Sequence, residues 1–199
     1  MNLSAAAGTS ALTALFTALN GGTLNLYTGT PPANVAAALV SGNTLIGTAD
    51  IASTALSGSI TTSGDNVVGT LAFTSSTFTT GAAGTVTFAR ALNTTPVGVV
   101  DLGASSSWLP STSVVVNQMA SNGGNLYICT TAGTTAASGG PTGTGTSITD
   151  GTAVWSYVQP GTASVTMSNV AVTASLSVTI NSATISLPIT VPVGSALVT

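Results

Sequence analysis

The change in hydrophobic pattern that decides the fold lies in the stretch Ser10-Ala-Leu-Thr-Ala-Leu-Phe-Thr-Ala-Leu-Asn20-Gly-Gly-Thr-Leu-Asn-Leu-Tyr-Thr28. Its first half has the i, i+3, i+4, i+7 apolar spacing of a one-sided helix, carried by Leu12, Leu15, Phe16 and Leu19. Ser10 or Thr9 is predicted to cap the start of this helix, and Asn20-Gly21 to end it. Across residues 23–28 apolar and polar residues alternate, as in a half-buried strand. The sequence therefore predicts a short N-terminal helix followed by β structure.

Nearly all of the chain after this point predicts short strands. The candidates are residues 44–49, 67–73, 85–89, 97–102, 113–118, 126–131, 153–158, 164–167, 175–180 and 183–189. They are rich in Thr and Val, which suit a pleated sheet, and Gly, Asn, Ser and Pro turns separate them. One Ala-rich stretch, residues 35–40, is predicted to form a single helical turn. Because helical crossovers are missing, we expect an all-β fold, an antiparallel sandwich or barrel.

The charge content excludes most chemistry. The 199 residues include one Arg, no Lys, no His and four acidic residues, all Asp, so only 3% of the chain is charged and the net charge is -3. An ordinary domain carries roughly 25% charged residues. These few groups supply no general acid-base pair, metal cage or phosphate clamp, so we expect no enzyme, metal or cofactor. A single cation also excludes a nucleic-acid partner, which needs clusters of Lys and Arg.

Hydropathy raises the question of a membrane protein, since the mean hydropathy is +0.58. Polar residues and Gly interrupt every apolar run, however, and none reaches the ~20 residues that cross a bilayer. No signal peptide is expected, because no basic residue precedes the apolar residues 11–19. The abundance of Val, Ile and Leu argues against disorder. The single cysteine, Cys129, forms no internal disulfide and has no His or Lys to activate it.

Strand edges in this chain lack the lysines that normally prevent strands from pairing with other chains. We therefore expect neighbouring copies or another partner surface to cover the edges, which predicts a homo-oligomer.

The composition changes within residues 104–161. This stretch holds both tryptophans, two of the three tyrosines and the only cysteine. We expect residues 1–103 and 162–199 to form one discontinuous domain. Residues 104–161 are then a small β module, inserted between two strands of that domain and projecting outward.

The two outer pieces resemble a known class of virion proteins. The resemblance is carried by Leu19-Asn-Gly-Gly-Thr-Leu-Asn-Leu-Tyr27-Thr-Gly-Thr-Pro-Pro32, Leu45-Ile-Gly-Thr, Gly84-Thr-Val-Thr-Phe-Ala-Arg90, Val100-Asp101-Leu102 and Ala183-Thr-Ile-Ser-Leu-Pro-Ile189. These segments are similar to capsid decoration (cement) proteins of tailed bacteriophages. The resemblance implies a jelly-roll-like β-sandwich that binds the major capsid protein on the outer capsid surface of the virion.

The insert carries a second resemblance. Trp108, Gly124-Asn-Leu-Tyr127-Ile-Cys-Thr-Thr-Ala-Gly133 and Ile148-Thr-Asp-Gly-Thr-Ala-Val-Trp155-Ser-Tyr-Val158 look like a short β module found in phage tail-fibre and head proteins. That module is distantly similar to chitin-binding carbohydrate modules. The resemblance implies contact with host surface glycans.

Four aromatic residues of the insert are candidates for such a contact: Trp108, Tyr127, Trp155 and Tyr157. Their flat faces can stack on a sugar ring. A small module also needs large side chains for its own core, and we favour this second interpretation. Strand alternation places Trp155 and Tyr157 on one face, and Tyr157 is expected to be the most exposed of the four.

The charged residues have structural interpretations. Asp150 precedes Gly151 and a strand, which is typical of a turn, and it has no acidic neighbour with which to bind calcium. Asp50 and Asp65 are equally isolated in sequence. Arg90 is predicted to pair with Asp101, within the subunit or across an interface, with the internal pair favoured.

These observations together predict a non-enzymatic virion protein that decorates and stabilises the outer capsid of a tailed bacteriophage. The main alternative is a tail, neck or fibre component that binds a receptor or glycan through the insert. A secreted adhesin or surface-layer protein is a third class with a similar composition.

Overall fold

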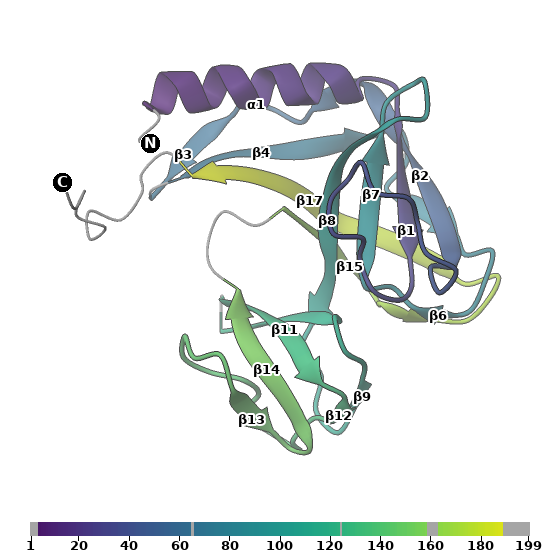
Figure 1. Ribbon diagram of the computed structural model, residues 1–199, viewed down its shortest axis with the longest axis vertical. Coiled ribbons are helices and arrows are strands. Elements are labelled where there is room, and N and C mark those ends of the chain that lie inside the picture. Colours follow the sequence, from purple (N-terminus) through teal and green to yellow (C-terminus); the bar gives the residue numbers. More distant parts are fainter. Residues whose placement is uncertain (1–3, 65, 124, 159–162, 189–199) are drawn as a thin grey trace.

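The computed structural model describes residues 4–64, 66–123, 125–158 and 163–188. It contains one helix and an extensive sheet, so the all-β prediction is confirmed (Figure 1). The elements in chain order are α1 (Ala5–Leu19), β1 (Thr23–Tyr27), β2 (Leu45–Leu56), β3 (Thr61–Ser63), β4 (Asn66–Phe73), β5 (Thr77–Thr79), β6 (Gly84–Thr85), β7 (Phe88–Leu92), β8 (Gly98–Ser107), β9 (Ser113–Val114), β10 (Met119–Asn122), β11 (Asn125–Thr131), β12 (Gly133–Thr134), β13 (Ile148–Asp150), β14 (Ala153–Val158), β15 (Ser164–Met167), β16 (Ala171–Val172) and β17 (Ser177–Pro188). No helix in this described part is long and apolar enough to cross a bilayer.

Seven strands form a closed circuit in the order β8-β15-β17-β4-β2-β1-β7, and β7 pairs with β8 to complete it. We call this circuit the closed sheet. Most of its pairs are antiparallel, but β15 lies parallel to β8. The antiparallel pairing expected from the sequence therefore has its exceptions at β8, which is also parallel to β10. The physical reason is the insert: the chain leaves along β8 and returns along β15 after a long excursion, as a parallel pair requires.

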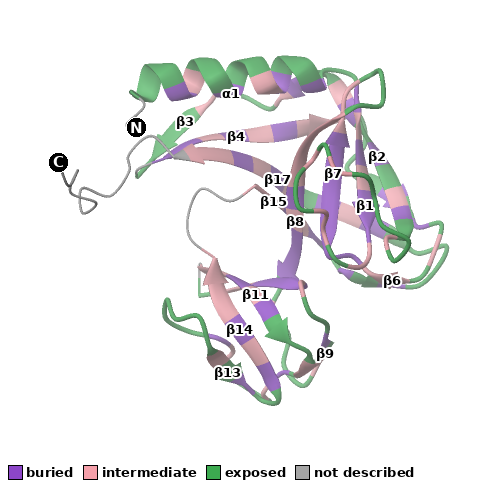
Figure 2. Ribbon diagram, viewed as in Figure 1, coloured by how far each residue is buried: buried purple, intermediate pink, exposed green. Residues whose placement is uncertain are grey.

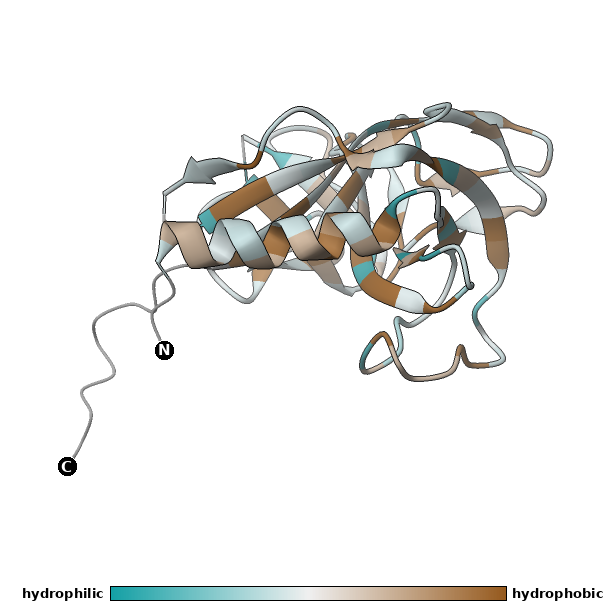
Figure 3. Cartoon of the chain, turned by 90° about the horizontal axis from the view of Figure 1, so that it is seen from above, coloured by the Kyte–Doolittle hydropathy of each residue, from teal (hydrophilic) through white to brown (hydrophobic). Residues whose placement is uncertain are grey.

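Helix α1 lies across β2, β4 and β17 and buries one side against them (Figure 2). Leu12, Phe16 and Leu19 are buried in the same cluster as the inward residues of the closed sheet. The remainder of the helix surface consists of small uncharged residues, and strongly hydrophilic positions are few over the whole molecule (Figure 3). The apolar spacing read from the sequence thus marks the buried face of the helix.

The start of α1 differs from the prediction. The helix begins at Ala5, and Ser4 is the cap, its side-chain oxygen accepting a hydrogen bond from the Ala7 amide at 3.2 Å. The alanines of the first turn are good helix formers, and they are exposed, so they add nothing to the apolar spacing. The predicted end is confirmed, since Asn20 caps the helix and Gly21 follows it with a φ of 67°.

Several strand predictions need correction. Residues 85–89 divide between β6 and β7, and only the first two residues of 113–118 form a strand. The predicted strands 175–180 and 183–189 correspond to one long strand, β17, which begins at Ser177 and has an irregularity in its pairing with β15. The last of these residues, Ile189, lies outside the described part. Residues 35–40 form no helix, because the Asn34 side chain accepts the amide hydrogens of Ala36 and Ala37 and holds a turn.

Strands β10, β11, β14 and β13 form an antiparallel extension of the sheet, with the β9–β12 pair beside it. We call β9 to β14, with Trp108, the module. It has a hydrophobic cluster of its own, separate from that of the closed sheet. Strand β8 runs through the predicted boundary at residues 103–104, and Ala104 packs in the larger cluster. The other boundary, residues 161–162, lies outside the described part.

Docking of α1 on the sheet gives a first testable prediction. A Cβ atom at Gly69 of β4 would overlap the ring of Phe16, which is buried under the helix. We expect Gly69→Ala to destabilise the protein by about 1–3 kcal/mol through overpacking, measured by urea denaturation. Gly42→Ala is the matched control, because its new methyl group meets nothing within 4 Å. Equal stability of the two variants would contradict the packing described here.

Candidate binding site

The centre of the module is the carboxylate of Asp150, the last residue of β13. One oxygen, Oδ2, accepts the indole N–H of Trp108 at 2.8 Å and that of Trp155 at 3.1 Å. The other oxygen, Oδ1, accepts the backbone amide of Ala136 at 2.9 Å. Asp150 is only 4% exposed, so these three donors replace water around a buried charge. Three segments far apart in the sequence are thus joined through one side chain.

The sequence interpretation of Asp150 as a turn residue was therefore incomplete. Gly151 does follow it with a φ of 65°, in the left-handed region that favours glycine. The additional role as a common acceptor was missed because Trp108 lies 42 residues away in sequence. The only signal was an aspartate between two tryptophans in a stretch otherwise without charge.

The two tyrosines of the module lie on neighbouring strands, β11 and β14. Tyr127 is 1% exposed, and its hydroxyl donates to the Gly143 carbonyl at 3.2 Å and accepts from Asn125. Tyr157 is half-buried and meets the edge of Tyr127 at a centroid distance of 6.1 Å. The tyrosines therefore contribute mainly to the packing of the module.

The four predicted glycan-contact residues do not share an exposed face. Trp155 is fully buried at 0% exposure and Tyr127 nearly so, which leaves Trp108 and Tyr157 partly accessible. One face of Trp108 is covered by the loop at Gly140, where an added Cβ would lie 3.0 Å from the indole atom Cδ2. A stacking platform for sugars needs open aromatic faces, and this arrangement provides few.

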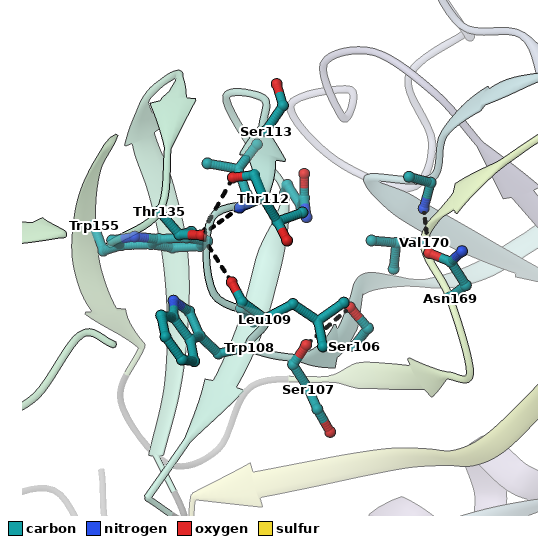
Figure 4. Close-up of a pocket in the computed structure, with 14 residues that line it drawn as sticks. Ser106, Ser107, Trp108, Leu109, Thr112, Ser113, Thr135, Trp155, Asn169 and Val170 are labelled. Carbon is teal, nitrogen blue, oxygen red and sulfur yellow. Dashed lines mark hydrogen bonds between the residues drawn. The ribbon is translucent and has the colours of Figure 1, made fainter. Parts of the chain in front are cut away.

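A small cavity lies beside the two indoles, between the module and Asn169 and Val170 of the closed-sheet body (Figure 4). Its volume is about 30 Å³. This is the space of one water molecule and too small for a sugar ring. Thr135 closes one wall, donating to the Leu109 carbonyl at 2.7 Å and accepting the Thr112 amide at 2.8 Å. The cavity is part of the module's packing rather than a ligand pocket.

The chain's only cation forms the predicted internal ion pair. Arg90 of β7 lies directly opposite Asp101 of β8, and its Nε and Nη2 donate to the two carboxylate oxygens at 2.7 and 2.8 Å. The hydrogen bond to Asp101 is the main cause that raises the pKa of Arg90. The same guanidinium donates to the carbonyl of Ala37 at 3.0 Å. Arg90 therefore fixes the β1–β2 loop on the outside of the closed sheet.

This geometry gives a second prediction. In Arg90→Lys the charge remains, but an ammonium cannot reproduce the two parallel bonds to Asp101 and the bond to the loop. We expect a loss of about 1–2 kcal/mol in the free energy of unfolding, measured by urea denaturation. Faster amide exchange at residues 34–37 should accompany it. A variant as stable as the parent, with the loop equally protected, would contradict this role.

Cys129 is buried in the core of the module and donates its thiol hydrogen to the Thr131 carbonyl. Burial raises the pKa of this thiol, which keeps it protonated and unreactive. Among the residues that the structure describes, no group of three His, Cys, Asp or Glu side chains is placed to hold a metal ion. The buried polar side chains in the same residue ranges all have hydrogen-bond partners.

Comparison with known proteins gave no relatives: no protein-family model, no curated protein and no solved structure matches this chain.

Proposed function

We propose that this chain is a structural protein of a tailed-bacteriophage particle, which decorates and stabilises the outer capsid and catalyses no reaction. Its partners are the major capsid protein and further copies of itself. The resemblance of residues 19–32 and 84–90 to decoration proteins suggests this class of function.

The observation that carries the proposal is the division into two hydrophobic cores with an almost uncharged surface. The larger core fills the closed sheet and the smaller one fills the module, which extends from β8 (Figure 2). A decoration protein needs a broad body that rests on the shell and a second part that projects from it. A surface with few charges requires little desolvation when it is buried against capsid subunits, where a stable contact takes roughly 800 Å² from each partner.

The alternative role, a tail or fibre protein that binds glycans, has less support. It requires the aromatic residues of the module to be open to a sugar, whereas Trp155 and Tyr127 are buried. Both serve the packing around Asp150 and the β11–β14 pair.

The decisive experiment counts copies of the protein in purified particles by quantitative mass spectrometry, with the major capsid protein as internal reference. A decoration protein should be present in a simple ratio to the capsid subunits. A tail, neck or fibre protein should be present in far fewer copies, and that result would replace the proposal with the alternative. Absence from the particle would exclude both.

A further inference from the structure

An open groove lies between the closed-sheet body and the module. Residues 28–30, 83–85 and Thr87 line its body wall, and residues 115–117 line its module wall. The groove has a volume of about 550 Å³, within the roughly 300–1,000 Å³ typical of ligand sites. None of the lining residues is charged. The groove therefore fits an uncharged occupant.

The module wall presents two apolar side chains to solvent. Val115 and Val116 are 39% and 47% exposed. A tight turn holds them there: the Gln118 amide donates to the Val115 carbonyl, the Gln118 side chain accepts the Val115 amide, and Asn117 has a φ of 70°. The valines are thus held by the backbone, and their exposure is a fixed property of the turn.

Exposed apolar residues also occur in the chain segment next to the body wall of the groove. Asn43 donates to the carbonyls of Thr28 and Thr30 at 3.1 and 2.9 Å, which fixes the neighbouring loop against the groove wall. That loop exposes Val40 at 55%, and Leu45, the first residue of β2, is 45% exposed. Clustered exposed apolar residues of this kind are typical of a protein interaction surface.

The residues after β17 have the chemistry to fill this groove. The inward positions of β17, which include Ala183, Ile185 and Leu187, alternate with outward ones. The same alternation continues in sequence through Ile189, Val191 and Val193, and residues 189–199 contain no charged side chain. Pro192 lacks an amide hydrogen and cannot donate a hydrogen bond to a neighbouring strand. A segment that contains it is therefore better suited to binding through its side chains than to a central position in a sheet.

In the described part of the chain the pairing of β17 ends at Pro188, which lies opposite Asn66, the first residue of β4. This end of β17 lies toward the start of α1, whereas its other end lies near β6 (Figure 1), and both residues of β6 line the groove. The twelve residues of β17 span roughly 36 Å, whereas a segment of five residues, such as 189–193, spans at most about 18 Å. This segment is therefore too short to turn back along β17 to the groove of its own chain.

We infer that the groove binds the segment 189–193 of a second copy of this chain. Ile189, Val191 and Val193 of one copy pack against Val115 and Val116 of the next. The contact joins two different surfaces, so it is head-to-tail and closes into a ring or propagates as a chain. This inference rests on the groove and the sequence of the segment and does not depend on the capsid.

The test uses sedimentation velocity on the full-length protein. We expect the parent to self-associate and Val116→Asp to weaken that association at least ~tenfold, because the contact would bury an unpaired carboxylate. Val97→Asp is the matched control, since Val97 is 58% exposed and lies outside the groove. A monomeric parent, or equal effects of the two substitutions, would overturn the inference.

A mixing experiment then tests the identity of the occupant. A chain ending at Pro188 keeps the groove and lacks the segment, while Val116→Asp keeps the segment and has a damaged groove. Each alone should be monomeric, and together they should form a one-to-one complex. Val191→Asp in the full-length chain repeats the test without shortening the protein. Failure of the mixture to associate, or association of the shortened chain with itself, would refute the segment as occupant.

Discussion

Trp155→Ala is expected to unfold the module while the closed sheet stays folded. Trp155 is fully buried at the centre of the smaller cluster, and its indole donates to Asp150. Removal of a buried tryptophan costs about 3–5 kcal/mol, which is a large part of the stability available to so small a core. The closed sheet has a separate cluster and loses no contact within it.

Hydrogen exchange measured by mass spectrometry on the intact chain distinguishes the two parts. In Trp155→Ala the amides of β11 and β14 should exchange rapidly, while those of β2 and β4 keep their protection. Tyr157→Ala is the matched control on the same strand, because Tyr157 is only half-buried and its loss should leave the module folded. If Trp155→Ala retained full protection in β14 and had lost a glycan ligand instead, the core interpretation would fail and the fibre alternative would gain support.

Asp150→Asn is expected to destabilise the module by about 3 kcal/mol or more, although the two side chains have the same shape. The carboxylate accepts three N–H groups, through both of its oxygens. An asparagine has one acceptor oxygen, and its NH2 group would replace the other carboxylate oxygen. The hydrogens of that NH2 group would then face the N–H donors that this oxygen had bound. Hydrogen bonds to a charged group contribute roughly 1.5–3 kcal/mol each, and at least one buried donor would be left without a partner.

Urea denaturation followed by amide exchange in β13 and β14 measures this loss. Asp50→Asn provides the control, since Asp50 is exposed on β2 and the substitution should change stability by less than about 0.5 kcal/mol. Equal stability of Asp150→Asn and the parent would show that the charge of Asp150 has no structural role.

The fold class and the end of the helix could be read from the sequence because they depend on local patterns. Strand β14 was predicted at its observed bounds, and its first four residues alternate between buried and half-buried. The start of α1 was missed because Ala5 and its neighbours face solvent and carry no apolar signal. Closure of the sheet was expected only as one of two alternatives, sandwich or barrel, since it depends on β8 meeting β15 across the whole insert. Local patterns do not encode which distant strands meet.

Because the sheet is closed, the expectation of unprotected strand edges no longer applies to it. Each strand of the closed sheet has a neighbour on both sides, so the lack of lysine leaves no long edge unprotected there. Among the described strands, β3, β5 and β13 have a single partner, and each is three residues long. The strands of the separate pairs β9–β12 and β6–β16 also have a single partner, and each is two residues long. The prediction of a homo-oligomer therefore depends on the groove rather than on open edges.

In the candidate site, likewise, one interaction could be predicted from the sequence and another could not. The Arg90 and Asp101 pair could be predicted because both residues were the obvious partners in a chain with so few charges. The arrangement around Asp150 could not, because the positions of Trp108 and Ala136 relative to β13 are set by the fold of the whole module.

The placement of both tryptophans on one carboxylate has a practical consequence. The chain has only these two indoles, and both lie in the module. Selectively excited tryptophan fluorescence therefore reports on the smaller core alone, while far-ultraviolet circular dichroism is dominated by the larger sheet and the helix. Comparing the two signals during denaturation would resolve two melting transitions in one uncut polypeptide. The protein carries its own internal probe for deciding whether its two cores unfold together or in succession.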